Sequence, residues 1–416
     1  MNEREKYPLD KFFNKKPFRA AYNEELWRNS ELSFLAYYKK LFRKYMRMLE
    51  QSWPIPLPGD TTDGSQFNEV LSHSKKNART VGKGIIKALT HCLEGRRHEG
   101  FAAFSECLPE IGSFEPMIDK SYNEHRYFRI RLTDNVAEIG TVSDMFHIPF
   151  SKRHNIREYR YSILGYPCLY LASSLYTCWE EMGRPPFHTV VLSRFQPTDS
   201  FNRTKILFLS IAPRQYKEEI ARRARVAEHT GKHIEIESLK TFFEFWPLQL
   251  ACSIPTKYPK GVFHEEYIIP QFLMEWIRCY RKVNGVCYRT TKVPQMDWEQ
   301  MHPYLLYNYA FPARQIASDH CSELSRDFLL TPPIPFELSL TCDRQELKHG
   351  DFSGFFNPAS PIPFTLPTGI STPSYQKTGF GNAEYRSACD TAIALGERTD
   401  EIGRWMPHTM AVVAEK

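Results

Sequence analysis

The stretch YRYSILGYPCLYLASSLYTCWEEM, residues 159–182, carries three side chains capable of binding or chemistry within an otherwise small and apolar segment. Arg160 comes ten residues before Tyr170, and Glu181 follows eleven residues after Tyr170. The portion CLYLASS predicts a short buried strand, and SLYTCWEEM predicts a short helix after it. The stretch therefore predicts a strand–helix unit with an arginine before the strand, a tyrosine within it and a glutamate at the end of the helix.

Each of these three side chains has a functional and a structural interpretation. A guanidinium is a planar fork that fits a pyrophosphate, but most arginines are surface or ion-pair residues. A strand tyrosine can stack on a flat heterocycle, but most belong to a core. Glu181 stands beside Glu180 and is either a solvated helix end or a functional anion. The residue types alone leave both interpretations open.

The elements around this stretch mix strands and helices. Strand patterns occur in RYFRIRL, TVVLSRF, KILFLSIA and GVCYRTT, and an amphipathic helix pattern occurs in EEYIIPQFLMEWIRCYRKV. A strongly polar helix is expected in QYKEEIARRARVAEHTG. Because no regular βαβ rhythm appears, the sequence favours an α+β fold over a doubly wound parallel sheet.

Changes of composition divide the chain into three expected domains. Residues 1–118 predict a helical accessory domain, because apolar residues in SFLAYYKKLFRKYMRMLE and from about Phe67 to Leu93 recur every three or four positions. Residues 119–338 contain the strand patterns. Residues 339–416 are rich in Pro, Gly and Ser and predict a loop-rich extension with one weak helical signal.

The composition excludes several classes of protein. The chain has 416 residues, 42% hydrophobic and 25% charged, which is typical of a globular protein. Its net charge of +6, without one long basic run, predicts no nucleic-acid partner. Ten cysteines without a CxxC pair predict reduced thiols. No secretory signal and no apolar run of about 20 residues is found, so we expect a cytoplasmic protein without a membrane partner.

Most familiar catalytic motifs are missing from the sequence. It contains no HExxH, paired CxxC, GxxxxGK[ST] or GxSxG pattern. Two GxG fragments, GKGIIK and GFGNAE, lack both the third glycine and a preceding strand. We therefore expect no bound metal and no Rossmann or P-loop nucleotide site.

The stretch from Arg160 to Glu181 resembles the RES domain, a family known from bacterial toxin modules and named for its Arg, Glu and Ser residues. The family has an arginine segment, a glycine with an LYLA-like strand, and a glutamate at the end of the next helix. YRYS, PCLYLASS and Glu181 stand at these places. EEYIIPQFLMEWI and NGVCYRTT resemble a later section of the family, which places Thr290 at the serine position. The resemblance covers roughly residues 122–335.

The resemblance implies a fold, a substrate and a role for each residue. The fold would be ADP-ribosyltransferase-like, a split β-core with surrounding helices, and NAD would be a substrate that loses nicotinamide. Glu181 would stabilise the charge that develops on the ribose, and Arg160 would hold the pyrophosphate or ribose. Tyr170 would stack on nicotinamide, and Thr290 would orient Glu181 or a ribose oxygen. No metal would be required.

The resemblance also implies a biological role, a bacterial growth-arresting toxin or defence effector. The expected partners are NAD and an antitoxin or regulatory protein, and a homo-oligomer is considered as well. Two alternatives stay open. One is an ADP-ribosyltransferase that modifies a macromolecule, and the other is a non-catalytic binding module on the same fold, a possibility raised by Thr290 in place of serine.

Overall fold

The computed structural model describes residues 8–13, 15, 18, 24–55, 64–108, 118–119, 126–135, 141–209, 236–280, 283–293, 301, 305–314, 319–340, 362, 364–365, 371–372 and 374–394. The chain forms two compact units. The first contains Met1–Asp119, Tyr159–Tyr161 and Leu207–Trp276, and the second contains Lys120–Glu158, Ser162–Ile206 and Ile277–Lys416. Below they are called the helical unit and the sheet unit.

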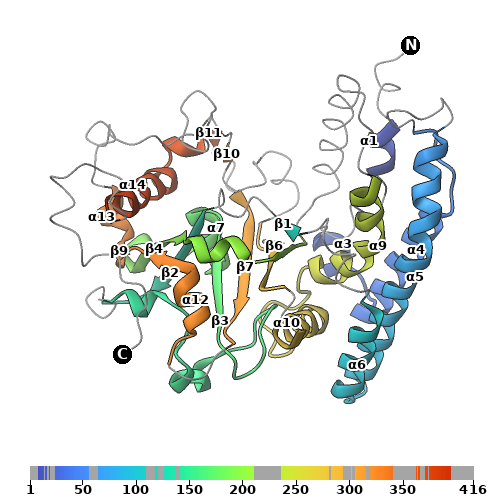
Figure 1. Ribbon diagram of the computed structural model, residues 1–416, viewed down its shortest axis with the longest axis horizontal. Coiled ribbons are helices and arrows are strands. Elements are labelled where there is room, and N and C mark those ends of the chain that lie inside the picture. The colour runs from blue at the N-terminus through green and yellow to red at the C-terminus, as the bar shows by residue number, and fades with distance from the viewer. Residues whose placement is uncertain are drawn as a thin grey trace, which may run out of the picture. The chain divides into compact units, whose positions relative to one another are not determined.

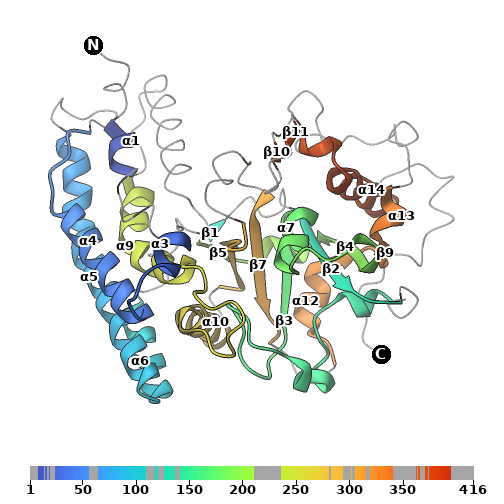
Figure 2. The ribbon, with the colours of Figure 1, turned by 180° about the vertical axis from the view of Figure 1, so that it is seen from behind.

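The helical unit is built from long helices that lie side by side in Figures 1 and 2. Its elements are α1 (Pro8–Phe13), α3 (Glu24–Arg28), α4 (Phe34–Leu49), α5 (Ser65–Leu93), α6 (Arg97–Cys107), β1 (Ile118–Asp119), α9 (Ile236–Ser253), η8 (Glu265–Tyr267) and most of α10 (Ile268–Tyr280). The periodic apolar positions of α4 and α5 form buried faces, as their sequence pattern predicts. The described residues 236–276, which the sequence division places within 119–338, belong to the same compact unit as these N-terminal helices.

Helix α9 is the element that ties the later segment to the N-terminal helices. It is buried almost throughout and packs against α5. Its Phe243 and Trp246 rings contact Phe12 and Phe18, at centroid distances of 5.6 Å and 4.8 Å respectively. These aromatic contacts form the centre of the helical unit's core.

A proline inside α9 creates a gap in its backbone hydrogen bonds that a tyrosine fills. Pro247 has no N–H, so it cannot donate to the carbonyl of Phe243, four residues earlier. The hydroxyl of Tyr45, from α4, donates to this carbonyl at 2.6 Å. The hydroxyl of Tyr38 donates to the carbonyl of Pro247 at 3.0 Å. Both tyrosines are fully buried, so α4 supplies the donor that the proline removes.

We predict that Tyr45→Phe lowers the free energy of unfolding by about 1–3 kcal/mol, because it leaves the buried carbonyl of Phe243 without a donor. In a Pro247→Ala background the new N–H supplies that donor, so the same change should cost clearly less. Urea titration of the four proteins measures both costs. Tyr38→Phe is the control, because Pro247→Ala adds no donor to the carbonyl at position 247. Equal costs of Tyr45→Phe in both backgrounds would contradict the explanation.

The sheet unit is a sheet with short helices. Its strands are β2 (Tyr127–Leu132), β3 (Cys168–Ala172), β4 (Val190–Pro197), β6 (Gly285–Arg289), β7 (Tyr307–Pro312), β8 (Phe328–Leu330) and β9 (Ile334–Pro335), and β5 (Ile206–Phe208) lies at the boundary in sequence between the units. The order within the unit is β6-β7-β3-β2-β4-β8, with β9 also on β4, and these neighbours pair antiparallel.

Helices, 3-10 turns and one small hairpin complete this unit. They are η4 (Val142–Met145), η5 (Phe150–Asn155), α7 (Leu175–Glu181), η6 (Phe187–Thr189), η7 (Asp199–Arg203), α12 (Ser322–Asp327), α13 (Phe336–Leu340), β10 (Phe364–Thr365), β11 (Ser371–Thr372), η11 (Tyr375–Lys377) and α14 (Gly379–Ala394). The described part of the C-terminal extension packs into the unit, since Phe380 contacts Trp179, Phe187 and Phe336.

The structure confirms the α+β class and the helical N-terminal region. Strands β2 to β6 and helices α4, α5, α7 and α10 lie where their patterns predict them. Strand β7 and helix α9 were not predicted. The expected polar helix QYKEEIARRARVAEHTG lies outside the described residues. Within the described chain, no helix combines the length and apolar character needed to cross a membrane.

Candidate functional site

Helix α7 follows strand β3 closely in the chain, and Glu181 is its last residue. Ser174 begins the helix: its hydroxyl oxygen accepts from the N–H of Thr177 at 3.0 Å, and its hydroxyl donates to the carbonyl of Leu305 at 2.7 Å. Gly183, at φ 82°, follows the end of the helix in the left-handed region that glycine favours. The helix is therefore seven residues long, and its end is determined locally.

The carboxylate of Glu181 is held by two side chains from other elements. Its Oε1 accepts a hydrogen bond from the hydroxyl of Thr290 and another from the Nδ2 of Asn308, each at 2.6 Å. Thr290 is fully buried and Asn308 is nearly so, while Glu181 is partly exposed. Among the described residues, no hydrogen-bond partner is seen for Oε2 of Glu181. One oxygen is thus fixed and the other is left for solvent or a ligand.

The strand register brings Thr290 and Asn308 to the same place. Tyr288 lies directly opposite Asn308 in the β6–β7 pair, and the N–H of Thr290 continues the ladder by donating to the carbonyl of Leu306. Residues two apart on a strand share a face, so Thr290 and Asn308 lie on one face of the sheet. Helix α7 covers β2 and β3 (Figures 1 and 2).

Tyr170 belongs to this face as well. It lies directly opposite Ala310 in the β3–β7 pair, two residues along from Asn308. Its side chain is partly exposed, and its backbone carbonyl accepts from Nη1 of Arg129 at 2.8 Å. The structure thus brings Tyr170, Thr290 and Asn308 to one face of the sheet, with Glu181 bonded to two of them. The expected stacking of Tyr170 on nicotinamide stays a prediction.

Arg160 is placed in the helical unit by its contacts. It is buried, its Nη1 donates to the carbonyl of Cys252 at 3.2 Å, and its guanidinium lies 5.0 Å from the ring centroid of Tyr267. Its Nη2 is buried and has no hydrogen-bond partner among the described residues. These contacts give Arg160 a structural role within its own unit, and its expected role toward NAD stays a prediction.

The two neighbouring glutamates have different environments. Glu180 is buried, and its Oε2 accepts a hydrogen bond at 2.9 Å from Nε of Arg184, with which it forms an ion pair. The two residues are four positions apart in the sequence. Glu181 points to Thr290 and Asn308 instead, because adjacent helical residues differ in direction by about 100°. The structure therefore gives Glu180 an internal partner and leaves Glu181 as the candidate functional carboxylate.

Asn308 is the site residue that the sequence did not reveal. Every residue of β7, YNYAFP, is buried, and Asn308 is the one amide among aromatic and apolar side chains. A buried amide requires a hydrogen-bond partner, which is the signal that could have singled it out. The sequence could not supply the partner, since Glu181 lies 127 residues away.

Among the described residues, no three His, Cys, Asp or Glu side chains gather in a way that could hold a metal ion. The expectation of a metal-free reaction stays a prediction.

We predict that removing either donor to Glu181 destabilises the protein. Thr290→Val and Asn308→Leu should each lower the free energy of unfolding by about 1–3 kcal/mol, because the half-buried carboxylate loses one charge-assisted bond. Thr290→Ser keeps a hydroxyl and should cost much less. Denaturant titrations measure these values. Repeating Thr290→Val and Asn308→Leu in a Glu181→Leu background tests whether their effect acts through the carboxylate. If either substitution lowers the free energy of unfolding as much there as in wild type, the explanation is contradicted.

A second carboxylate, Glu384 of α14, holds the opposite end of α7. Its Oε1 accepts from the N–H of Leu175 and from the hydroxyl of Tyr375, each at 2.6 Å. Glu384 is fully buried, and its Oε2 has no hydrogen-bond partner among the described residues. Burial raises the pKa of Glu384 to about 7, although these bonds and the charges of Arg126 and Arg194 oppose the rise. Helix α7 is thus anchored at both ends.

This raised pKa predicts a stability that falls with pH. The folded protein keeps the proton of Glu384 up to about pH 7, whereas an ordinary glutamate in the unfolded chain releases it near pH 4.5. The folded state therefore binds more protons than the unfolded state between about pH 4.5 and pH 7. As pH rises through this window, the free energy of unfolding decreases by about 3 kcal/mol.

Glu384→Gln should remove this pH dependence, because the amide oxygen still accepts both bonds but does not ionise. Unfolding free energies of wild type and variant at pH 5 and pH 8 measure the effect. Glu337→Gln, at an exposed position of α13, is the control and should leave the slope unchanged. The same slope in wild type and Glu384→Gln would refute the assignment.

Comparison with known proteins gives one similarity. The chain is 34% identical over 310 residues to Putative toxin YopC from Bacillus subtilis (strain 168). The alignment covers 73% of this chain and 66% of YopC, so the chain spans just under two thirds of that protein's length. No family model matches the chain, and no solved structure matches it. Membership of the RES family and the ADP-ribosyltransferase-like fold therefore stay predictions.

Proposed function

We propose that this protein is a toxin that degrades NAD by releasing nicotinamide, with Glu181 as its catalytic carboxylate. The observation that carries the proposal is the fixed carboxylate of Glu181, held by Thr290 and Asn308 beside an oxygen left for a ligand. The toxin role is supported by the similarity to a protein named as a putative toxin. The NAD substrate is supported by the sequence resemblance to the RES domain.

The proposed reaction needs an anion at a defined place. The bond between C1′ of the ribose and the nicotinamide nitrogen breaks, and its electron pair goes to that nitrogen, which leaves as neutral nicotinamide. The ribose becomes an oxocarbenium-like cation, as in glycoside hydrolysis. Water then adds to C1′ and releases a proton to solvent, which gives ADP-ribose.

Glu181 suits this step because its position is determined before substrate binds. The two donors hold Oε1, so the carboxylate needs little reorganisation when positive charge develops nearby. Its Oε2 is then available to face the ribose or to accept from a ribose hydroxyl. The positive charge of NAD lies on the nicotinamide ring in the ground state and moves to the ribose in the transition state, so a carboxylate beside the ribose stabilises the transition state more and accelerates the reaction.

Thr290 would act as a positioning residue in this proposal. The family position holds a serine, and threonine keeps the hydroxyl that donates to Glu181 at 2.6 Å. The extra methyl group is accommodated, since Thr290 is fully buried. Thus the departure from the family pattern keeps the one chemical group that the site uses.

The surroundings of Glu180 bear on the transferase alternative. A second carboxylate that activates an acceptor would need to be accessible, but Glu180 is buried in its ion pair with Arg184. Hydrolysis is therefore the favoured form of the proposal. A cytoplasmic location, where NAD is plentiful, and an antitoxin or regulatory protein that silences the enzyme are parts of the same proposal.

We predict that Glu181→Gln slows nicotinamide release by a hundredfold or more, about 2.7 kcal/mol of lost transition-state stabilisation. The amide oxygen can still accept from Thr290 and Asn308, so the fold and NAD binding should change little. Purified protein is incubated with NAD alone, and nicotinamide and ADP-ribose are measured by chromatography.

Glu180→Gln serves as the matched control and should retain most of the activity. A variant Glu181→Gln as active as wild type would remove Glu181 from the mechanism. Wild type that releases no nicotinamide, with or without added cell lysate, would argue for the non-catalytic alternative. Labelling of macromolecules that appears only with lysate would identify a transferase.

A further inference from the structure

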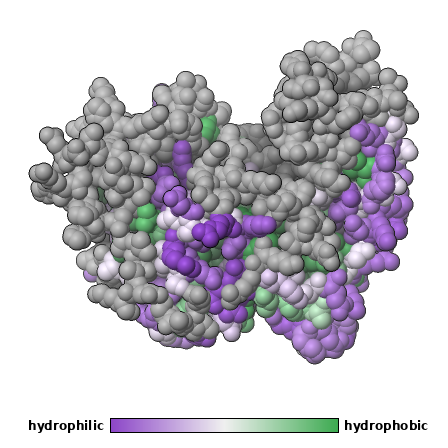
Figure 3. Space-filling view, viewed as in Figure 1, coloured by the Kyte–Doolittle hydropathy of each residue, from purple (hydrophilic) through white to green (hydrophobic). Residues whose placement is uncertain are grey.

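Helices α4 and α5 together carry a strong positive charge. They contain ten Lys and Arg residues and a single acidic residue, Glu69, which is a net charge of +9 against +6 for the whole chain. The rest of the chain is therefore slightly acidic, and the positive charge is concentrated on these two helices. Figure 3 shows a largely hydrophilic surface over α4, α5 and α6.

The two helices run antiparallel, which places their cations side by side. Glu50, at the C-terminal end of α4, lies 3.5 Å from Lys75 and 3.1 Å from Arg79. Eight residues before Glu50 on α4, the ring of Phe42 lies against Gly82, which comes after Lys75 and Arg79 on α5. The contact is so close that a Cβ on Gly82 would meet the ring at 2.1 Å. The exposed arginines of α4 thus run alongside the exposed lysines of α5.

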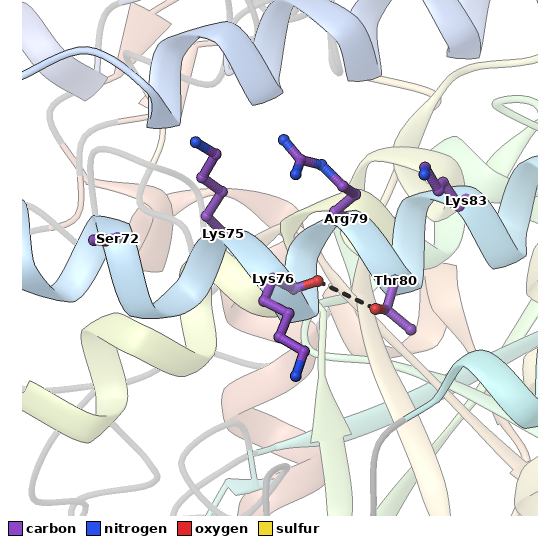
Figure 4. Close-up of a pocket in the computed structure, with 6 residues that line it drawn as sticks. All are labelled: Ser72, Lys75, Lys76, Arg79, Thr80 and Lys83. Atoms are coloured by element: carbon purple, nitrogen blue, oxygen red, sulfur yellow. Dashed lines mark hydrogen bonds between the residues drawn. The ribbon is translucent and has the colours of Figure 1, made fainter.

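We define the basic face by six exposed cations at helical spacing: Arg43, Arg47, Lys76, Arg79, Lys83 and Lys87. A shallow hollow of about 290 Å³ on α5 overlaps this face and is lined by four cations and two hydroxyl residues. Figure 4 shows Lys75 and Arg79 extending to one side of the helix and Lys76 to the other. Among the six cations of this face, the described chain shows an ion pair for Arg79 only, with Glu50.

This arrangement of charge is unfavourable for the helix by itself. Arg79, Lys83 and Lys87 follow one another at four-residue intervals, so like charges are neighbours on the helix surface. Each such pair destabilises a helix by about 0.2–0.5 kcal/mol. Only Arg79 among these three is compensated, by Glu50. A polyanion that contacts the row would remove the repulsion.

We propose that the basic face binds double-stranded nucleic acid through its phosphates. Successive cations along α5 are about 6 Å apart along the axis, and each strand of a duplex presents a phosphate about every 3.4 Å. The row can therefore contact several phosphates at once. The binding would be independent of sequence and driven by counterion release.

Two other anionic partners fit the surface less well. Insertion of a helix into a membrane interface requires an exposed apolar face, but the apolar faces of α4 and α5 are buried within the helical unit. Single strands are held by exposed aromatic side chains, and the tyrosines and phenylalanines of α4 and α5 are buried. A duplex needs neither feature.

The proposal departs from the sequence expectation of no nucleic-acid partner. The cations are spaced every three or four residues in two separate segments, so no basic run appears in the sequence. Helical periodicity and the pairing of α4 with α5 gather them on one surface. The proposal is independent of NAD cleavage, because none of these cations belongs to the candidate site.

The test uses the full-length protein and a fluorescent 25-base-pair DNA duplex of arbitrary sequence, with binding measured by anisotropy at several salt concentrations. We expect binding at low salt that weakens steeply as salt increases. The triple variant Lys76→Gln, Lys83→Gln, Lys87→Gln should bind at least tenfold more weakly. Its slope of log affinity against log salt should be smaller by about 2.7, or about 0.9 for each lost phosphate contact.

The control removes the same number of charges elsewhere, with Lys152→Gln, Lys260→Gln and Lys377→Gln at exposed positions. It should bind almost as wild type does. A duplex RNA should bind similarly, since the contacts are to phosphates. No duplex binding by wild type, equal losses in the two triple variants, or a poly-glutamate peptide that binds as tightly as the duplex would each overturn the proposal.

Discussion

The hydrogen bonds to one carboxylate oxygen of Glu181 join three parts of the sheet unit that are far apart in sequence. A half-buried carboxylate requires compensation, and Thr290 and Asn308 supply it from the end of β6 and from β7. The same bonds require these strands to be in register with each other and helix α7 to end at Glu181. The arrangement thus ties the local geometry of the candidate site to the pairing of the sheet.

Helix α7 is short, and tertiary contacts at both ends hold it. Seven residues are too few for a stable isolated helix, so its order comes from its surroundings. Ser174 and Glu384 satisfy N–H groups of its first turn, and Glu181 is bound at its last position. The extension that carries Glu384 therefore supports the element on which the candidate catalytic carboxylate lies.

The helical unit uses a similar compensation. Pro247 leaves a backbone carbonyl of α9 without its usual donor, and Tyr45 of α4 provides one. The outer sides of α4 and α5 carry the positive charge of the chain, while their inner sides hold the aromatic core. The core residues and the exposed cations thus lie on opposite faces of the same helices, so the cations of the basic face take no part in core packing.

Local sequence patterns predict the elements with a clear period: helices α4, α5 and α10, strands β2, β3, β4 and β6, and hence the α+β class. The sequence also placed Glu181 at a helix end and Thr290 at a strand end, because both positions depend on local patterns. Strand β7 and helix α9 escaped prediction, since YNYAFP has no alternation and α9 contains a proline among aromatic residues that favour strands. The tertiary structure alone reveals that Asn308 binds Glu181, that Glu384 binds the first turn of α7, and that α4 pairs with α5. Each of these features depends on a contact between residues distant in sequence. Such contacts follow from the packing of the whole chain and leave no periodic trace.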